Sequence, residues 1–371
     1  MKKSVFAAAA LSVCVLLLSA CGSENLYAFE LKDLGNGVSF HTEAQSSFLA
    51  GNYNDIALYA EGLSEKSLPE AVRLEWQANP KDANAAPKEY IVELSVNSDF
   101  NSALTYTTAE TQLDIYNLYL ATDYYWRVTA ISENGKKSVS KPSTFTTDSV
   151  APRNLYVDGV TNVRDLGGWS LPYGRVRQGA IIRCGRLNES GTDNVNIEIT
   201  QQGIDTMLNE LNIKTEIDLR DPVKHNFEAG GITSSPLGES VNYISIPLEW
   251  NVNNLLTGNT GAVARFFEVI ADEDNYPIIY HCNIGTDRTG LFALLINGLL
   301  GVSEDDLYRD YMFSNFGNIG GQRNVNGIAN SYVKTIKNTE GADLSEKIKN
   351  YLLSIGVTQE QIYNLIYIML K

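Results

Sequence analysis

The sequence predicts two domains of different fold class behind an export signal: an all-β sandwich first, then an α/β domain. Three observations predict this order. Residues 1–20 are mostly apolar, residues 66–148 alternate apolar and polar side chains in short runs, and residues 152–371 alternate short apolar runs with helical periods. With 371 residues, of which 44% are hydrophobic, the chain is long enough for two cored domains.

Residues 1–20 have the features of a secretory signal. Lys2 and Lys3 precede an apolar stretch that ends at Leu18 and is short for a membrane span. The stretch "LSAC", which ends at Cys21, resembles the bacterial lipobox, and this resemblance implies that Cys21 is acylated. The alternative is a cleaved signal beside an incidental cysteine. We expect an exported protein that is lipid-anchored to the cell envelope, at an outer membrane or the cell surface.

The formal net charge of −15 argues against binding to nucleic acid or to bare anionic lipid, because the long-range field repels phosphate-rich polymers. Beyond Cys21, the remaining thiols are Cys184 and Cys282, and the three histidines are dispersed. Since no ligand-spaced pair results, we expect no metal and no cofactor. We expect Cys184 to be a buried apolar residue, with a regulatory disulfide to Cys282 as the alternative.

Residues 66–148 are predicted to form the β-sandwich. The runs "VRLEW", "YIVEL" and "YYWRVTA" each place alternate side chains on one apolar face. The stretch "LYLATDY" (118–124) resembles the tyrosine corner of fibronectin type III domains, with Leu120 where that family usually has proline. The resemblance implies a fibronectin type III-like domain that binds a protein or glycan ligand or acts as a spacer. Residues 21–65 are less regular, and we expect a linker with an extra strand there.

Residues 152–371 are predicted to form the α/β domain. Two short β-rich runs, 214–220 and 276–282, are bounded by breakers, as buried strands are. Helical spacing follows in three stretches: 291–301, 304–316 and 358–370.

The stretch "HCNIGTDRTG" runs from His281 to Gly290, between a predicted strand and a predicted helix. Because the strand ends at Cys282 and the helix begins near Arg288, the residues between them must form a tight loop over a helix N-terminus. Such a loop directs backbone N–H groups inward, where they bind an anion and stabilise a thiolate. The planar guanidinium of Arg288 can hold two oxygens of a phosphate. This combination is suited to transfer of a phosphoryl group onto sulfur.

The spacing Cys-(five residues)-Arg, followed by Thr-Gly, resembles the signature loop of the protein tyrosine phosphatase superfamily. It is most similar to the bacterial tyrosine/lipid phosphatase branch, whose loop reads Cys-x-x-Gly-Lys-Asp-Arg-Thr-Gly. Three further stretches support that branch: "NVRDLGGW" (162–169), "IIRCGRLN" (181–188) and "DYMFSN" (310–315). The resemblance covers about residues 153–371 and implies an α/β cysteine-phosphatase domain. Because all four stretches lie after Pro152, we expect a fragment of about 150–371 to carry the activity.

The resemblance also implies a mechanism. Cys282 attacks phosphorus, Arg288 and the loop amides hold the phosphoryl oxygens, and water then hydrolyses the phosphocysteine. His281 orients the loop through backbone bonds, and Thr289 donates a hydrogen bond to the thiolate. The implied substrate-binding residues are Asn283, Ile284, Gly285, Thr286 and Thr289.

The implied substrates are phosphate monoesters of the phosphotyrosine type, in a protein or peptide, with dual specificity as an extension. Phosphoinositides or inositol phosphates are the alternative. A protein of another class would be a catalytically weak lipoprotein that binds phosphate for adhesion or interaction. Thr286 stands where the branch has lysine, so a cation beside the bound phosphate is missing. This departure predicts a preference for monoesters over substrates with several phosphates, unless other basic residues approach the site.

The general acid has several candidates. Asp287 lies inside the loop, at the position that the resembled branch uses for proton transfer. Asp218 and Asp221 in "DLRDP" are alternatives, and so is Glu249, which stands ahead of the loop near the spacing of the mobile acid loop in other superfamily members.

Two of the aspartates also have structural interpretations. Asp218 could pair with Arg183 or Arg220 and thereby fix the end of a strand. Asp165 is expected to orient Arg288 or to cap a turn in "RDLGG".

Overall fold

The computed structural model describes residues 26–81, 86–188, 198–221, 233–249, 255–328 and 332–371. The predicted signal (1–20) and Cys21 lie outside these ranges. The chain divides into two compact units: unit 1 comprises Met1–Phe40 with Glu70–Ser149, and unit 2 comprises His41–Pro69 with Val150–Lys371. No helix within the described residues is long and apolar enough to cross a bilayer.

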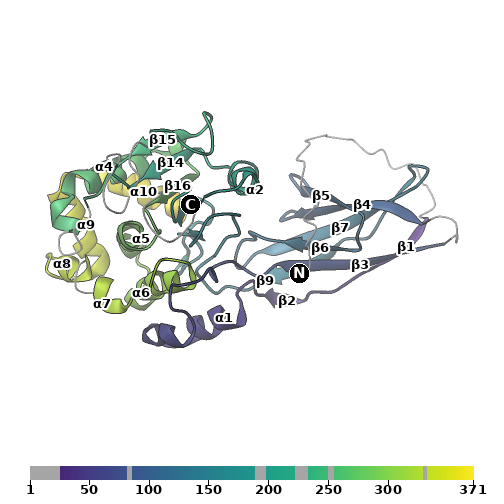
Figure 1. Cartoon of the computed structure of the whole chain (residues 1–371), viewed down its shortest axis with the longest axis horizontal. Coiled ribbons are helices and arrows are strands. Elements are labelled where there is room, and N and C mark those ends of the chain that lie inside the picture. Colours follow the sequence, from purple (N-terminus) through teal and green to yellow (C-terminus); the bar gives the residue numbers. More distant parts are fainter. Residues whose placement is uncertain (1–25, 82–85, 189–197, 222–232, 250–254, 329–331) are drawn as a thin grey trace. The chain divides into compact units, whose positions relative to one another are not determined.

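Unit 1 is the β-sandwich that the alternating pattern predicts (Figure 1). One sheet has the order β1-β3-β6 and the other the order β2-β9-β7-β4-β5, with β8 paired to β7. The strands are β1 (Tyr27–Leu31), β2 (Asn36–Val38), β3 (Val72–Pro80), β4 (Pro87–Ser95), β5 (Leu104–Thr108), β6 (Gln112–Ile115), β7 (Asp123–Ser132), β8 (Lys137–Val139) and β9 (Ser143–Thr147). Alternate residues of β3, β4 and β7 are buried, among them Leu74, Val92 and Trp126, so the two sheets share an apolar core.

The stretch 118–124 forms a tyrosine corner. The Tyr124 hydroxyl accepts a hydrogen bond from the backbone amide of Tyr119 at 2.9 Å. The Tyr124 ring stacks on Phe145, with ring centroids 5.4 Å apart. Leu120, at the usual proline position, is buried, so an apolar contact occupies that place.

The centre of unit 2 is a sheet in the order β10-β13-β16-β14-β15. The strands are β10 (Arg164–Asp165), β13 (Ile181–Cys184), β14 (Thr215–Asp218), β15 (Asn242–Ser245) and β16 (Ile278–His281). The last four are parallel neighbours, and every residue of β13, β14 and β16 is buried. Both faces of these strands are buried, and their charged side chains Arg183, Glu216 and Asp218 are held by buried partners. The α/β prediction is confirmed, with strands inside both predicted runs.

Helices of unit 2 pack around this sheet (Figure 1). They are α1 (Glu43–Ala50), α2 (Gln201–Asp205), α3 (Leu255–Gly258), α4 (Thr260–Ile270), α5 (Asp287–Leu299), α6 (Glu304–Phe313), α7 (Val325–Ile328), α8 (Lys334–Lys337), α9 (Leu344–Ser354) and α10 (Gln359–Leu370). Helix α5 contacts β13, β16, α6 and α9, and all its residues from Arg288 to Leu299 are buried. It is therefore the central helix of the unit. A small hairpin, β11 (Ser170–Leu171) with β12 (Gly174–Arg175), completes the described strands.

Residues 21–65 differ from the predicted linker. Strands β1 and β2 belong to the sheets of unit 1, whereas α1 and the following 3₁₀ turn η1 (Tyr53–Leu58) belong to unit 2. The ring centroid of Phe48 lies 6.5 Å from that of Phe313 and 5.8 Å from that of Phe316. Only three of the eight residues of α1 are buried, so its periodicity is too weak to reveal a helix from the sequence.

Hydrogen bonds join this early segment to the start of the later one. Asn154 Nδ2 donates to the Ser67 carbonyl at 2.9 Å, and the Asn162 amide donates to Ser67 Oγ at 3.1 Å. Thr161 Oγ1 donates to the Glu65 carboxylate. Unit 2 is therefore built from two separate stretches of chain, and the expected domain of residues 152–371 omits one of them.

Candidate active site

The "HCNIGTDRTG" stretch forms a loop between β16 and α5. Strand β16 ends at His281, and α5 begins at Asp287, one residue before the predicted start. The Gly290 amide donates to the Thr286 carbonyl at 2.7 Å and closes the first helical turn. Cys282 is 2% exposed and Arg288 is 5% exposed, so both lie inside the fold.

Gly285 is required at the tightest point of this loop. Its φ is +70°, in the left-handed region that side chains rarely adopt. A Cβ here would lie 2.4 Å from the carbonyl carbon and oxygen of Cys184, which are backbone atoms that cannot move aside. Any other residue would push the loop away from β13.

The buried side chains of Asn162 and Arg183 donate hydrogen bonds to backbone carbonyl groups of the loop. Asn162 Nδ2 donates to the Gly285 carbonyl at 3.0 Å and to the Ile284 carbonyl at 3.3 Å. Arg183 Nη2 donates to the Gly285 carbonyl at 2.7 Å. Because a trans peptide places its N–H opposite its C=O, the amides of Gly285 and Thr286 are directed to the other side, into the hollow of the loop.

The first loop residue is held in the same way. The Arg186 amide donates to the Asn283 carbonyl at 3.0 Å, and Arg186 Nη1 donates to Asn283 Oδ1 at 2.9 Å. The amide of Ile284 therefore also points into the hollow. Arg288 Nη1 donates to the carbonyl of Leu219, the residue that follows β14, at 3.2 Å, so the end of this strand anchors the guanidinium. The arrangement is an anion-binding nest at a helix N-terminus.

The three sequence motifs outside the loop meet at Asp310. Its Oδ1 accepts from Arg164 Nε at 3.0 Å, and its Oδ2 accepts from Arg183 Nη1 at 2.5 Å. Burial alone would raise the pKa of Asp310, but the guanidinium groups of Arg164 and Arg183 outweigh it and hold this pKa below its usual value. Burial lowers the pKa of Arg164 to about 10, which leaves it charged at neutral pH. This ion-pair network fixes the side chain that supports the loop at Gly285.

Asp165 has both carboxylate oxygens occupied. Oδ1 accepts from the Gly167 amide at 2.8 Å, and Oδ2 accepts from Arg153 at 2.7 Å and from the Gly179 amide at 2.5 Å. Of the two roles expected for Asp165, these bonds fit the turn cap rather than the orientation of Arg288.

Asp218 pairs with Arg220, whose Nε and Nη2 reach its two oxygens at 3.0 and 2.7 Å. Tyr243 donates to the same carboxylate at 3.1 Å. Burial alone would raise the pKa of Asp218, but His281 and then Arg220 outweigh it and lower this pKa. Since such a carboxyl is ionised at neutral pH, the geometry favours the structural interpretation of Asp218 over a role as general acid.

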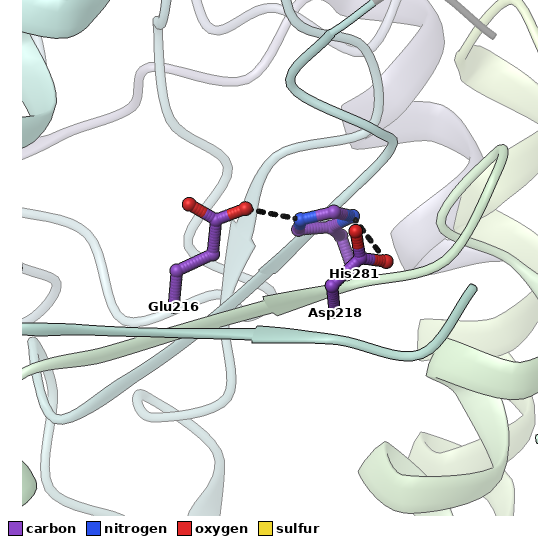
Figure 2. Close-up of side chains that lie close together, drawn as sticks. All are labelled: Glu216, Asp218 and His281. Atoms are coloured by element: carbon purple, nitrogen blue, oxygen red, sulfur yellow. Dashed lines mark hydrogen bonds and ion pairs between the residues drawn. The ribbon is translucent and has the colours of Figure 1, made fainter. Parts of the chain in front are cut away.

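His281 lies in a buried cluster with Glu216 and Asp218 (Figure 2). Its Nε2 is 2.9 Å from Glu216 Oε1, and its Nδ1 is 3.7 Å from Asp218 Oδ1. The parallel register of β14 and β16 places Asp218 opposite His281, and Glu216 lies two residues earlier on the same face. The ring is thus held beside the reactive loop by two strands.

Glu216 was not among the site residues that the sequence indicated. The available signal was an acidic pair two residues apart, Glu216 and Asp218, in a short strand predicted to be buried. Cation ligands of this kind lie together in the described chain only here. However, Arg220 holds the Asp218 carboxylate and Ser235 Oγ donates to Glu216 Oε2, so a metal ion would have to displace both. The cluster therefore fits support of His281 better than metal binding.

Asp287 lies at the first position of α5, with 14% of its side chain exposed. Tyr311 donates to its Oδ1 at 2.9 Å, and Arg323 Nε donates to its Oδ2 at 3.4 Å. Tyr332 donates to its backbone carbonyl at 3.0 Å. Burial, and then the charge of Asp287, raise the pKa of Tyr311 and of Tyr332, so both remain hydrogen-bond donors.

The other two acid candidates show less connection to the loop. The Glu249 side chain is exposed, and its backbone is held by Asn259, which accepts from the Glu249 amide at 2.8 Å. Asp221 is half-buried at the end of a described segment. Asp287 is therefore the acid candidate that the loop itself carries.

Thr286, Thr289 and the two thiols are buried, whereas Asn283 and Ile284 are partly exposed. The Thr286 hydroxyl lies 3.4 Å from both Asn162 Nδ2 and the Ile284 carbonyl, beneath the loop. Thr289 Oγ1 is buried and has no hydrogen-bond partner among the described residues, so the expected bond to the thiol is not formed here. Cys184 and Cys282 are both free thiols, and burial raises the pKa of Cys184 well above its usual value.

Family models of known proteins match residues in both units. The family model described as Tyrosine phosphatase family matches residues 155–370, more than half of the chain, and the Fibronectin type III domain matches residues 64–146. A curated protein of Cupriavidus necator, named as a putative tyrosine-protein phosphatase, is 28% identical over 187 residues. The match covers 44% of this chain and 63% of that relative, so the chain spans less than two thirds of the relative's length.

Among solved structures, the core catalytic domain of the PP-IP phosphatase Siw14 from S. cerevisiae is 16% identical, with a TM-score of 0.29 over 42% of this chain and 84% of that one. TpbA of P. aeruginosa is 17% identical, with a TM-score of 0.28 over 48% of this chain and 86% of that one. A human fibronectin type III domain is 26% identical, with a TM-score of 0.20 over 22% of this chain and 77% of that one.

Proposed function

Because the chain belongs to the tyrosine phosphatase family, we propose that it hydrolyses phosphate monoesters through a phosphocysteine intermediate. The observation that carries the proposal is the loop itself. Cys282 directly follows the central strand β16, and the carbonyls of Asn283, Ile284 and Gly285 are held outward by buried donors. This leaves inward amides to receive a phosphoryl group.

The proposed first step forms an S–P bond. The Cys282 thiolate attacks phosphorus, the bond from phosphorus to the leaving oxygen breaks, and that oxygen takes a proton from Asp287. Arg288 and the loop amides stabilise the phosphoryl oxygens in the transition state. Tyr311 and Arg323 position the Asp287 carboxyl for this transfer.

The proposed second step reverses these roles. Water attacks phosphorus, the S–P bond breaks, and Asp287 takes the proton from the water. Thr289 Oγ1, buried without a partner among the described residues, is the donor available to the departing thiolate. His281, held by Glu216, keeps the strand end in place and transfers no proton.

We further propose that the substrates are monoesters of the phosphotyrosine type and that the protein is exported and lipid-anchored at Cys21. The export proposal rests on the signal in residues 1–20 and the lipobox-like "LSAC". Labelling of cells with a radioactive fatty acid tests it. We expect label on the wild-type protein and none on Cys21→Ala; equal labelling of the two would contradict lipidation at this residue.

A substrate screen tests the catalytic proposal. Release of inorganic phosphate is measured from an aryl phosphate, phosphotyrosine and phosphoserine peptides, a phosphoinositide and an inositol phosphate. We expect hydrolysis of the aryl phosphate and the phosphotyrosine peptide, with inhibition by vanadate, which occupies the anion nest. Release of phosphate from none of the substrates would contradict the catalytic proposal.

A further inference from the structure

A pocket of about 200 Å³ lies beside the reactive loop, with Asp287 in its wall. We call it the side pocket; Tyr311, Arg323, Asn324 and Tyr332 also line it. Its volume is below the ~300–1,000 Å³ of sites that enclose a drug-sized ligand, so it suits a single charged group or side-chain end.

Hydrogen bonds between Asn315 and the backbone of Arg323 hold the arginine in the wall of the side pocket. Asn315, the last residue of "DYMFSN", accepts from the Arg323 amide at 2.7 Å and donates to the Arg323 carbonyl at 3.1 Å. The guanidinium then donates from Nη1 to the Gly321 carbonyl at 3.1 Å and from Nε to Asp287 at 3.4 Å. Within the described residues, no hydrogen bond is made by Nη2, and the side chain is 28% exposed. One edge of the cation therefore remains available to a ligand.

The other groups of the side pocket favour the same kind of ligand. Asn324 Oδ1 accepts from the Asn326 amide at 3.0 Å, which leaves the Asn324 amide nitrogen as a donor. Tyr311 and Tyr332 direct their hydroxyl groups to Asp287. The pocket thus offers donors and a cation, and a group with negatively charged oxygens matches them.

The other arginines near the loop are engaged elsewhere. Arg164 and Arg183 bind Asp310, and Arg220 binds Asp218, all in buried pairs. Thr286, which replaces the expected lysine, is itself buried. Among the described arginines beside the loop, Arg323 is the one that is partly exposed. Its position in the sequence, far from "DRTG", did not indicate that it lies there.

We propose that the side pocket is a second anion-binding site, in which Arg323 holds a carboxylate or phosphate that the substrate carries next to its reacting phosphoryl group. This inference rests on the proposed phosphatase function. It replaces the expectation, drawn from Thr286, that substrates with several anionic groups are disfavoured.

Occupation of the side pocket also acts on Asp287. An anion on Arg323 competes with Asp287 for the guanidinium. The groups that face this carboxyl are Arg323 and Tyr311. A substrate with a neighbouring anion is therefore held beside Asp287 by Arg323, and we expect KM to fall.

Phosphotyrosine peptides that differ only in their flanking residues test the proposal. One peptide has glutamates beside the phosphotyrosine and the other has glutamines, and an inositol bisphosphate is compared with a monophosphate as the phosphate arm. We expect wild type to prefer the glutamate peptide by about tenfold in kcat/KM, which is about 1.4 kcal/mol. In Arg323→Gln this ratio should fall to about one.

Arg309→Gln is the matched control. Arg309 is also an arginine paired with an aspartate, at 3.1 Å from Asp306 and 25% exposed, but it lies on α6 outside the side pocket. It should keep the wild-type ratio. A glutamate preference that survives in Arg323→Gln would overturn the proposal. So would a wild type that prefers neither the glutamate peptide nor the inositol bisphosphate. Aryl phosphate turnover reports separately on the phosphatase function, and binding of the two peptides to Cys282→Ser gives the ratio without turnover.

Discussion

Units 1 and 2 place their ion pairs differently. In unit 1 the pairs Lys32–Glu75, Arg73–Asp114 and Arg127–Glu93 have side chains that are 22–55% exposed. Unit 2 also buries pairs whose side chains are at most 5% exposed: Arg153–Asp165, Arg164–Asp310, Arg183–Asp310 and Arg220–Asp218. The sandwich thus keeps its charges at the surface, and the phosphatase-family unit places several inside.

This difference indicates that the buried ion pairs of unit 2 position other groups and add little to its stability. A buried ion pair loses the hydration of both charges, so it adds little net stability compared with apolar side chains of similar size. The described core of unit 1 is apolar. In unit 2, Arg183 joins the Asp310 pair to the Gly285 carbonyl, and Asp218 contacts both Arg220 and His281. We infer that the buried charges of unit 2 hold the reactive loop in its shape.

The largest expected effect comes from the reactive thiol. Cys282→Ser should lower turnover of an aryl phosphate by at least about 10³-fold, because serine is a far weaker nucleophile at neutral pH. Cys184→Ala is the control and should retain activity, since Cys184 is a buried thiol with a raised pKa. Steady-state kinetics measure both variants, and activity of Cys282→Ser within tenfold of wild type would remove the covalent mechanism.

The second effect concerns the two-segment construction of unit 2. A fragment of residues 150–371 should be largely unfolded, contrary to the expectation from the motifs alone. Loss of residues 41–69 exposes the apolar site that Phe48 fills, worth about 1.5–3 kcal/mol, and removes several buried hydrogen bonds of about 1 kcal/mol each. Circular dichroism measures folding, and a peptide of residues 41–69 should restore it. A fragment that is folded and active without the peptide would refute this division.

The third effect compares one substitution in the two units. Asp310→Asn leaves two buried guanidinium groups without their carboxylate, so we expect a loss of about 3–5 kcal/mol in the free energy of unfolding. Asp114→Asn removes an exposed pair with Arg73 and should cost about 0–1 kcal/mol. Urea unfolding gives both values. Equal losses would show that burial does not distinguish the two kinds of pair.

The smallest effect is a dependence of stability on acid pH. The pKa values of Asp310 and Asp218 are lowered in the fold, so their stabilisation is complete above the usual carboxyl pKa of 3.8 and is lost as pH falls through the folded-state values. Each should contribute up to about 1.4 kcal/mol per pH unit in that range. Calorimetry should show the unit 2 transition shifting below pH 4 more than the unit 1 transition. In Asp310→Asn the shift should be smaller, and an unchanged shift would assign it to other groups.

The sequence predicted those features whose determinants are local. The β-rich runs at 214–220 and 276–282, bounded by breakers, predicted buried strands, and the short spacing from Cys282 to Arg288 predicted a tight loop. Contacts that depend on the order of strands or on distant turns were not predictable. Glu216 meets His281 only because β14 lies beside β16. Arg323 reaches Asp287 only because Asn315 holds its backbone.

The segment from His41 to Pro69 belongs to unit 2 but lies in the sequence between the two parts of unit 1. The chain passes from unit 1 to unit 2 after Phe40, returns after Pro69, and passes to unit 2 again after Ser149. A recombination event at any one of these three junctions would separate a unit from part of its own sequence. Exchange of either domain alone between genes would require coordinated crossovers at all three junctions. We therefore expect the two domains to have been inherited together since the early segment joined unit 2.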